Sequence, residues 1–199
     1  MDTQNSNFLS REQAYSILTK YVKTPNLIKH SLATEAVMKA LYRRLYQGTP
    51  LDPKIEEEWG ITGLLHDADY EISKGHPEKH GLLLFEKEPN KIPEHIAYAI
   101  KAHNYEKTLV VPKNLLDWAI ACCDQLTGLI VAAALIHPEK KLAPLTTEFV
   151  LNRFHEKSFA KGADRRSILK CEEKLQIPLE EFVTITLDAM KNISDQLGL

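Results

Sequence analysis

The sequence contains little cysteine. Only three of the 199 residues are cysteines, and Cys122 and Cys123 are adjacent whereas Cys171 is distant. This spacing is neither that of a disulfide framework nor that of a zinc ribbon. The cysteine content therefore excludes a disulfide-stapled secreted fold, and it is typical of a protein that resides in the reducing cytoplasm.

An excess of charge of one sign is also lacking. The chain has 25 Lys and Arg residues and 27 Asp and Glu residues, so its formal net charge is -2. No global positive field attracts the protein to nucleic acid or to an anionic membrane. Any phosphate must therefore be recognised at a local site, and we expect a small ligand rather than a nucleic acid polymer.

We also find no pattern of a targeting segment or of a repeat in the sequence. Residues 1–7 have no basic stretch followed by an apolar run, so we expect no signal peptide. No internal repeat, low-complexity tract or linker divides the chain. At 199 residues with a hydrophobic fraction of 44%, the chain is long enough for one domain with a sizeable core. A single domain over residues 1–199 is the simplest interpretation.

Helix-start patterns recur along the chain. Ser10 with Gln13 three positions later predicts a capping box. Thr24-Pro25 and Asp52-Pro53 each place a capping residue before a proline that suits the first helical position. Pro93 predicts a further start, and three more helices are predicted after residue 145. The sequence therefore predicts an all-α fold.

Residues 115–136 are apolar nearly all round, which is typical of a buried helix or a membrane span. In a membrane, Asp124 and Gln125 would lie at mid-bilayer, at a cost of about 2.5 to 3.5 kcal/mol for the carboxylate alone. We therefore interpret the segment as the central core helix. A buried carboxylate must be paired, protonated or bound to metal. The alternative to metal is a hydrogen bond to a loop or to a helix N-terminus.

Three more residues of metal-ligand type occur in apolar surroundings. The buried run over residues 61–65 ends in His66 and Asp67, and His30 lies on the apolar face of the predicted helix that begins at Pro25. Imidazole nitrogens and carboxylate oxygens together suit a borderline divalent cation. One such histidine alone is more often a hydrogen-bonded core residue, but the set with Asp124 favours coordination.

The order His30, His66-Asp67, Asp124 resembles the HD superfamily of metal-dependent phosphohydrolases over roughly the first two-thirds of the chain. The resemblance implies an HD-domain helical bundle with a metal-binding core at about 24–136 and a helical extension at about 145–199. It also implies hydrolysis of a phosphoester or phosphoanhydride bond in a small phosphorylated metabolite, with nucleotides and dinucleotides among the candidates. The lysine that follows this pair in many cyclic-nucleotide-cleaving members is missing, which disfavours that substrate class.

Two further histidines extend the resemblance. Some HD hydrolases hold two metals, including bacterial enzymes that split diadenosine tetraphosphate symmetrically, and these have two extra histidines before the last Asp. His80 and His103 match those positions. The resemblance therefore implies one or two divalent ions per chain, of Fe, Mn, Zn, Co or Ni, with Mg as a further candidate. Because a carboxylate has two oxygens, Asp67 would bridge the two ions.

The residues after the His-Asp pair are candidates for proton transfer. We assign Asp69 to orienting water or protonating the leaving oxygen, with Tyr70 and Glu71 as alternatives, and an exposed helix cap as the non-catalytic interpretation of Asp69. Three basic residues of segment 153–166 are candidates for binding substrate phosphate: Lys161, Arg165 and Arg166. An ordinary solvated helix-loop-helix explains this basic segment equally well.

Two other functions fit the same ligand set. One is a di-iron HD-type oxygenase, which iron content together with oxygen consumption would distinguish. The other is a metal-bound regulatory or ligand-binding domain without catalysis, for which we expect one ligand to be missing. All ligands are present. The sequence leaves the substrate, the native metal and the oligomeric state open.

Overall fold

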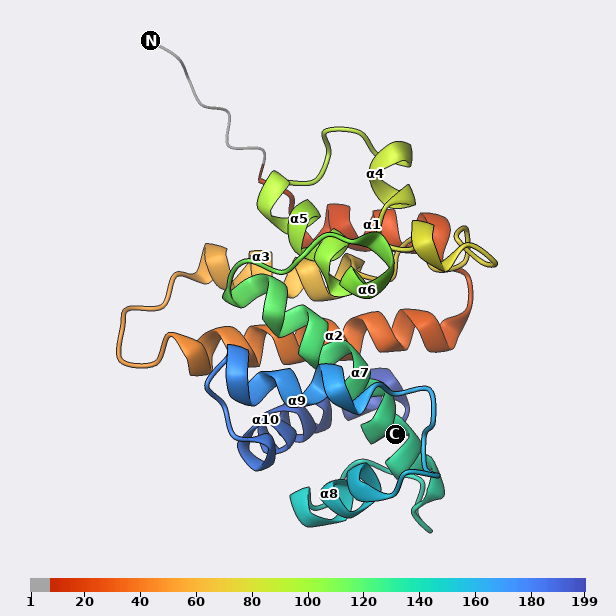
Figure 1. Cartoon of the computed structure of the whole chain (residues 1–199), viewed down its shortest axis with the longest axis vertical. Coiled ribbons are helices and arrows are strands. Elements are labelled where there is room, and N and C mark those ends of the chain that lie inside the picture. The colour runs from red at the N-terminus through yellow and green to blue at the C-terminus, as the bar shows by residue number, and fades with distance from the viewer. Residues whose placement is uncertain (1–7) are drawn as a thin grey trace.

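The computed structural model describes residues 8–199, and this part of the chain is helical with no strand (Figure 1). The expectation about a signal peptide falls on residues 1–7, which lie outside the described residues. The predicted all-α class is confirmed. In chain order the elements are α1 (Arg11–Tyr21), α2 (Pro25–Leu45), α3 (Pro53–Leu65), the 3-10 helix η1 (Pro77–Lys79), α4 (Leu83–Lys87), α5 (Glu94–His103), α6 (Tyr105–Thr108), α7 (Leu115–Ile136), α8 (Thr147–His155), α9 (Arg165–Lys174), α10 (Leu179–Lys191) and α11 (Ser194–Leu197).

Capping residues explain where the first helices begin. At α1, the Ser10 hydroxyl accepts a hydrogen bond from the backbone N–H of Gln13, and the Gln13 side chain accepts one from the backbone N–H of Ser10. At α3, the Asp52 carboxylate accepts from the backbone N–H of Lys54. The predicted capping box and the predicted cap before Pro53 are therefore confirmed.

The start of α2 is satisfied differently from the prediction. Thr24 is the N-cap residue, but its side chain makes no capping hydrogen bond. The carboxylate of Glu71 instead accepts from the backbone N–H groups of Lys23 and Thr24, at 3.0 and 2.8 Å. A residue from the turn after α3 thus caps α2, and this contact ties that turn to the helix that carries His30.

Two buried hydrophobic clusters form the core. The first joins α2 and α7 to the C-terminal helices, and the second joins α1, α3, α4 and α5. The C-terminal helices, which the sequence predicts as an extension, each add at least one buried side chain to the first cluster: Val150, Phe154, Ile168, Phe182 and Leu197. They therefore stabilise α2 and α7 directly and are part of the core.

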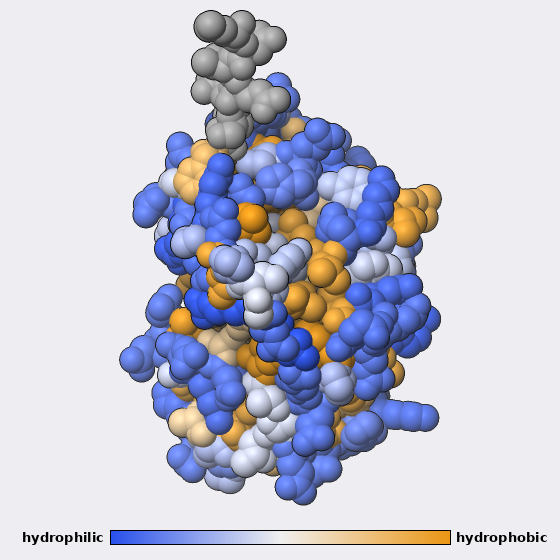
Figure 2. Space-filling model, turned by 90° about the vertical axis from the view of Figure 1, so that its left-hand side faces the viewer, coloured by the Kyte–Doolittle hydropathy of each residue, from blue (hydrophilic) through white to orange (hydrophobic). Residues whose placement is uncertain are grey.

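The central helix α7 spans the predicted residues, Leu115–Ile136, and is long and apolar enough to cross a membrane. It is mostly buried inside the fold, where it packs against α2, α5 and α9. The core helix of a soluble protein passes the same test of length and composition. Hydrophilic residues cover most of the face shown in Figure 2, with apolar residues visible between them.

Helices α2 and α3 approach closely because Gly63, the residue of α3 at their contact, has no side chain. A Cβ atom at Gly63 would lie 2.6 Å from the backbone oxygen of Thr34 and 2.9 Å from the backbone nitrogen of Glu35. Gly63 lies one turn before His66, and Thr34 lies one turn after His30. The close approach therefore sets the distance between these two imidazoles.

We expect Gly63→Ala to push α2 and α3 apart, since the clashing atoms belong to the backbone and cannot rotate away. The expected cost is about 1–3 kcal/mol of unfolding free energy, as for other overpacked core sites, together with weaker metal binding. Thermal melts and metal analysis measure both effects. Gly128→Ala in α7 is the control, because a Cβ there meets nothing within 4 Å. A Gly63→Ala protein with the parental melting temperature would contradict this account.

Candidate metal centre

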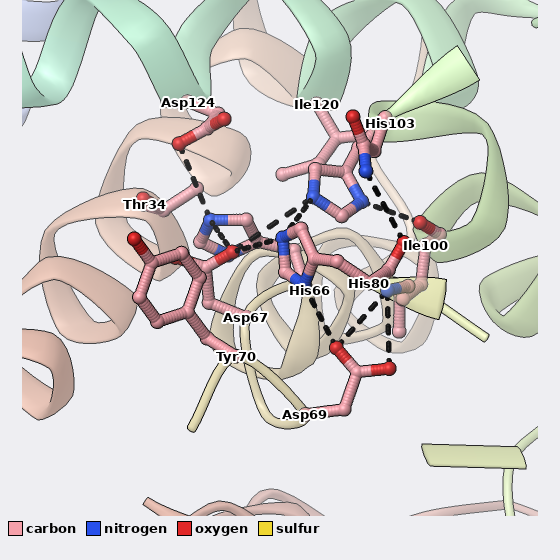
Figure 3. Close-up of polar contacts among 12 residues, drawn as sticks. Thr34, His66, Asp67, Asp69, Tyr70, His80, Ile100, His103, Ile120 and Asp124 are labelled. Atoms are coloured by element: carbon pink, nitrogen blue, oxygen red, sulfur yellow. Dashed lines mark hydrogen bonds and ion pairs between the residues drawn. The ribbon is translucent and has the colours of Figure 1, made fainter. Parts of the chain in front are cut away.

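The fold brings all six predicted metal ligands to one place. Figure 3 labels His66, Asp67, His80, His103 and Asp124 among them. Each ligand comes from a different local setting: α2, the end of α3, the turn after it, the loop after η1, the end of α5 and the middle of α7. They form two groups whose ligand atoms all lie within 4.8 Å of one another: His30, His66, Asp67 and Asp124, and Asp67, His80 and His103.

The adjacent pair His66 and Asp67 converges because α3 ends there. Neighbouring side chains on a continuous helix point about 100° apart, so both can reach one ion only where a helix ends or bends. Helix α3 ends at Leu65 and His66 is its C-cap. The Nε2 atom of His66 then lies 3.5 Å from Oδ1 of Asp67. The helix end therefore allows both residues to face one point.

Distances in the first group match those between ligands of one cation. His30 Nε2 lies 3.0 Å from Asp124 Oδ1 and 3.2 Å from His66 Nε2. His66 Nε2 lies 3.4 Å from Asp124 Oδ1, and His30 Nε2 lies 3.5 Å from Asp67 Oδ2. Ligands bound to zinc at 2.0–2.1 Å in a tetrahedron are separated by about 3.3 Å. The first group therefore has the spacing of a coordination site.

The second group shares Asp67 with the first. Its Oδ1 atom lies 3.0 Å from His80 Nε2 and 3.8 Å from His103 Nε2, while the two Nε2 atoms are 3.1 Å apart. Oδ2 of the same carboxylate faces His30. Oδ1 also lies 3.5 Å from His66 of the first group, so the Asp67 carboxylate contacts ligands of both groups, as a residue that bridges two ions must.

In every histidine of the cluster, the Nδ1 atom forms a hydrogen bond with an oxygen atom outside the two ligand groups. His66 and His103 donate to the backbone oxygens of Gly63 and Ile100, at 2.7 and 2.5 Å. His30 lies 3.2 Å from the Thr127 hydroxyl, which itself donates to a backbone oxygen and so accepts from the imidazole.

The Nδ1 atom of His80 lies 2.8 Å from the Asp69 carboxylate. Because carbonyl and carboxylate oxygens only accept, the proton of each neutral imidazole resides on Nδ1. All four Nε2 lone pairs therefore point into the cluster.

The pKa values show how strongly the cluster attracts positive charge. Burial alone would lower the pKa of His66, but the charge of Asp67 and the hydrogen bond to Asp124 raise it to about 9. Burial opposes a charged His80 as well, yet hydrogen bonds to Asp67 and Asp69 raise its pKa to about 10. Protons on these rings take the place that a divalent cation fills, so the donor set fits a metal ion.

Neighbouring charges also shift the pKa values of Asp67, Asp124 and His103. Burial disfavours the ionised forms of Asp67 and Asp124, but the neighbouring histidines outweigh it and hold both pKa values well below the usual range. His103 behaves oppositely: burial and the positive charges of His80 and His66 lower its pKa to about 4. His103 is therefore a neutral imidazole, the form that binds metal.

Asp69 lies beside the loop that carries His80. Its side chain is 1% exposed, and both carboxylate oxygens are engaged by the segment over residues 80–84. His80 lies in an extended conformation between η1 and α4. Both oxygens of Asp69 therefore contact the 80–84 segment, and a role of Asp69 in proton transfer stays a prediction.

The glycine beside His80 allows the loop that carries His80 to approach α5 closely. Gly81 has a φ of +86°, which side-chain-bearing residues rarely adopt, and a Cβ there would lie 3.1 Å from the backbone oxygen of Ile100 and 3.3 Å from the His103 ring. The loop can therefore lie directly on the end of α5. This contact brings His80 to His103.

The basic segment lies outside the cluster. The guanidinium of Arg165 donates to four backbone oxygens of its own loop, those of Phe154, Phe159, Ala160 and Ala163. Four of its five N–H groups are thereby used within the chain, and phosphate binding by Arg165 stays a prediction. Arg166 is exposed and pairs with Asp164 and Glu106, and Lys161 is exposed. For Lys161 and Arg166, phosphate binding remains a prediction.

Sequence reasoning missed Gln125, which links the basic loop to the cluster. Its Nε2 donates to Asp124 Oδ2 at 2.8 Å, and its Oε1 accepts from the backbone N–H of Asp164 at 3.0 Å. A polar residue next to Asp124 in an otherwise apolar helix was the available signal. Gln125 holds the second oxygen of Asp124 and so orients the first one toward the histidines.

Comparisons with protein-family models, with curated proteins and with solved structures gave no match to this chain. The candidate metal centre therefore rests on its own geometry and chemistry.

We expect the parent protein to bind a divalent transition metal and Asp124→Ala to lose it, because that carboxylate closes the first ligand group. Metal bound only to the folded state stabilises it, so the melting temperature should fall in the variant and in the chelated parent. Asp117→Ala removes another buried carboxylate of α7 and is the control for a purely structural loss. Full metal occupancy in Asp124→Ala would show that the ligand set is wrong.

We also expect two ions per chain in the parent and about one in His80→Ala and in His103→Ala, because these residues belong only to the second group. Metal per chain, measured after saturation and desalting, decides this. His95→Ala is the control, since His95 is exposed and pairs with Glu58 away from the cluster. A parent that holds one ion under metal excess would limit the site to its first group.

Proposed function

We propose that this chain is a metal-dependent phosphohydrolase that cleaves a phosphoester or phosphoanhydride bond of a small phosphorylated metabolite. The observation that carries the proposal is the convergence of four imidazole nitrogens and two carboxylates at the edge of a cavity of about 550 Å³. His80 belongs both to the metal cluster and to the wall of this cavity. A compound bound there would place its phosphate beside the ligands.

The donor set favours particular ions. Four imidazoles with two carboxylates suit Mn, Fe, Co, Ni or Zn, whereas Mg prefers a shell made of oxygen ligands and water. Once bound, such ions polarise phosphoryl oxygens and lower the pKa of a water molecule from 15.7 to about 7. The three cysteines are buried and unpaired, which fits the cytoplasm that we propose as the location.

The exposure of the ligands indicates the side from which substrate approaches. The side chains of His66 and His103 are 0% and 3% exposed, whereas those of His30 and Asp124 are 19% and 15% exposed. The side chain of His80, on the wall of the cavity, is 15% exposed as well. The cluster is therefore closed at the back by α3 and α5 and partly exposed at His30, Asp124 and His80, where the chain would admit a phosphoryl group.

The cavity beside His80 would bind the rest of the substrate. Its volume is in the range of small-molecule sites, and its walls combine apolar with polar side chains. Nucleotides and dinucleotides are the first candidates to test. The residues that line it are Thr24, Leu27, Tyr70, Glu71, Ser73, Lys74, Gly75, Pro77 and His80.

Among the residues that follow the His-Asp pair, Tyr70 is the one positioned to donate a proton or a hydrogen bond. Asp69 is engaged by the 80–84 segment, and the hydrogen bonds of Glu71 to Thr24 and Lys23 lower its pKa, so that it stays ionised. Tyr70 is 50% exposed and its ring packs edge-on against His80 with centroids 5.4 Å apart. We therefore assign its hydroxyl to contact with the substrate.

We expect Tyr70→Phe to lower kcat/KM about 10- to 100-fold, the loss expected for one hydrogen bond to a charged group. Metal content should stay unchanged, because Tyr70 is not a ligand. Tyr15→Phe, which removes a hydroxyl from the exposed side of α1, is the control. Equal kinetics in the parent and in Tyr70→Phe would remove Tyr70 from the site.

The function itself is tested by assaying the metal-loaded parent against nucleotides, dinucleotides and sugar phosphates, with release of phosphate or nucleotide as the signal. Asp124→Ala and chelated parent should be inactive on any compound that the parent cleaves. If the iron-loaded protein consumes oxygen and cleaves no phosphorylated compound, the proposed hydrolase is wrong and the oxygenase is the better proposal.

A further inference from the structure

We propose that Asp69 is a positioning residue that makes His80 a ligand of the second ion: its buried carboxylate fixes the Nδ1 proton and the orientation of that ring. The inference rests on the two-ion site of the proposed function. It assigns to Asp69 a role in binding the second ion and not in moving a proton for the substrate.

The carboxylate of Asp69 is held rigidly. Oδ1 accepts from His80 Nδ1 at 2.8 Å and from the backbone N–H of Gly81 at 3.0 Å. Oδ2 accepts from the backbone N–H groups of Gly81 and Leu84, at 3.0 and 3.2 Å. A carboxylate with these backbone donors stays in one rotamer. His80 therefore meets a fixed acceptor behind its ring.

His80 needs such a partner because of its place in the fold. His66 and His103 each donate to a backbone oxygen three residues earlier, so the last turn of their own helix orients them. His80 follows η1 in an extended conformation and has no helical turn of its own to supply that oxygen. Asp69 takes the place of the missing backbone oxygen from a distant part of the chain.

The negative charge of Asp69 also makes the number of carboxylates near the second ligand group equal to that in the first. The first contains two carboxylates, Asp67 and Asp124, whereas the second has only the oxygen that it shares through Asp67. Asp69 lies across the His80 ring from Asp67, since the two carboxylates contact opposite nitrogens of that ring (Figure 3). A carboxylate behind an imidazole increases its basicity toward a metal ion. Asp69 thus supplies negative charge to the second ion without touching it.

Asp69→Asn tests the proposal with almost no change of shape. The backbone N–H groups of Gly81 and Leu84 still require an acceptor, so the amide oxygen should face them and the NH₂ group should face His80 Nδ1. The hydrogen bond is then reversed, because the NH₂ group can only donate. The proton of the ring moves to Nε2, the atom that faces Asp67. We expect the second ion to bind about 10- to 100-fold more weakly.

Metal titration of the parent and of Asp69→Asn measures this, with retention of the first ion as the internal standard. Asp117→Asn is the matched control, because Asp117 is also buried and also accepts from a backbone N–H. Unchanged affinity for the second ion in Asp69→Asn would overturn the proposal. Equal weakening of both ions would also overturn it, since that result indicates general destabilisation.

A second measurement uses the parent protein, so it does not depend on whether a variant folds. In the zinc-loaded parent, ¹⁵N NMR of the imidazoles should show His80 bound through Nε2 with a proton on Nδ1. A proton on Nε2, or zinc at Nδ1, would overturn the proposal. The outcome is independent of catalysis: a protein that binds two ions, loses one in Asp69→Asn and cleaves no phosphorylated compound would retain this inference and lose the hydrolase.

Discussion

Four imidazole nitrogens and two carboxylates face one another across a few ångströms, an arrangement that a bound cation would stabilise. Each Nδ1 atom is tied from behind, so the Nε2 lone pairs cannot turn away. The neighbouring carboxylates attract positive charge to this place, and they raise the pKa of both His66 and His80 against the effect of burial. A bound divalent cation would supply that positive charge.

The rest of the chain holds the ligands in this arrangement. Gly63 lets α3 approach α2, and Gly81 lets the loop that carries His80 lie on α5. The C-terminal helices pack on α2 and α7, and Gln125 connects their loop to Asp124. Parts of the protein far from the ligands in sequence therefore contribute to the geometry of the metal centre through ordinary packing and hydrogen bonds.

The proposed function follows from the asymmetry of the centre. Its back is buried under α3 and α5, its edge at His30 and Asp124 is partly exposed, and His80 lies on the wall of a cavity that Tyr70 also lines. A wholly enclosed cluster would be typical of a structural metal, whereas a metal beside a small-molecule cavity can act on what the cavity holds. Asp69 and Glu71 are engaged elsewhere, which leaves Tyr70 as the polar side chain nearest to this role.

The sequence by itself determined the helices and the candidate ligands, because both depend on local patterns. Caps such as Ser10 and Asp52 act within one turn, and a charged residue such as Asp124 in an apolar helix requires a partner wherever that helix lies. Only the tertiary structure decided the roles of Asp69 and Arg165. Asp69 lies in a turn, where no helical period fixes the direction of a side chain, and Arg165 begins α9, where its guanidinium turns back onto carbonyl oxygens of the segment before that helix. Their partners therefore depend on how the chain turns around them.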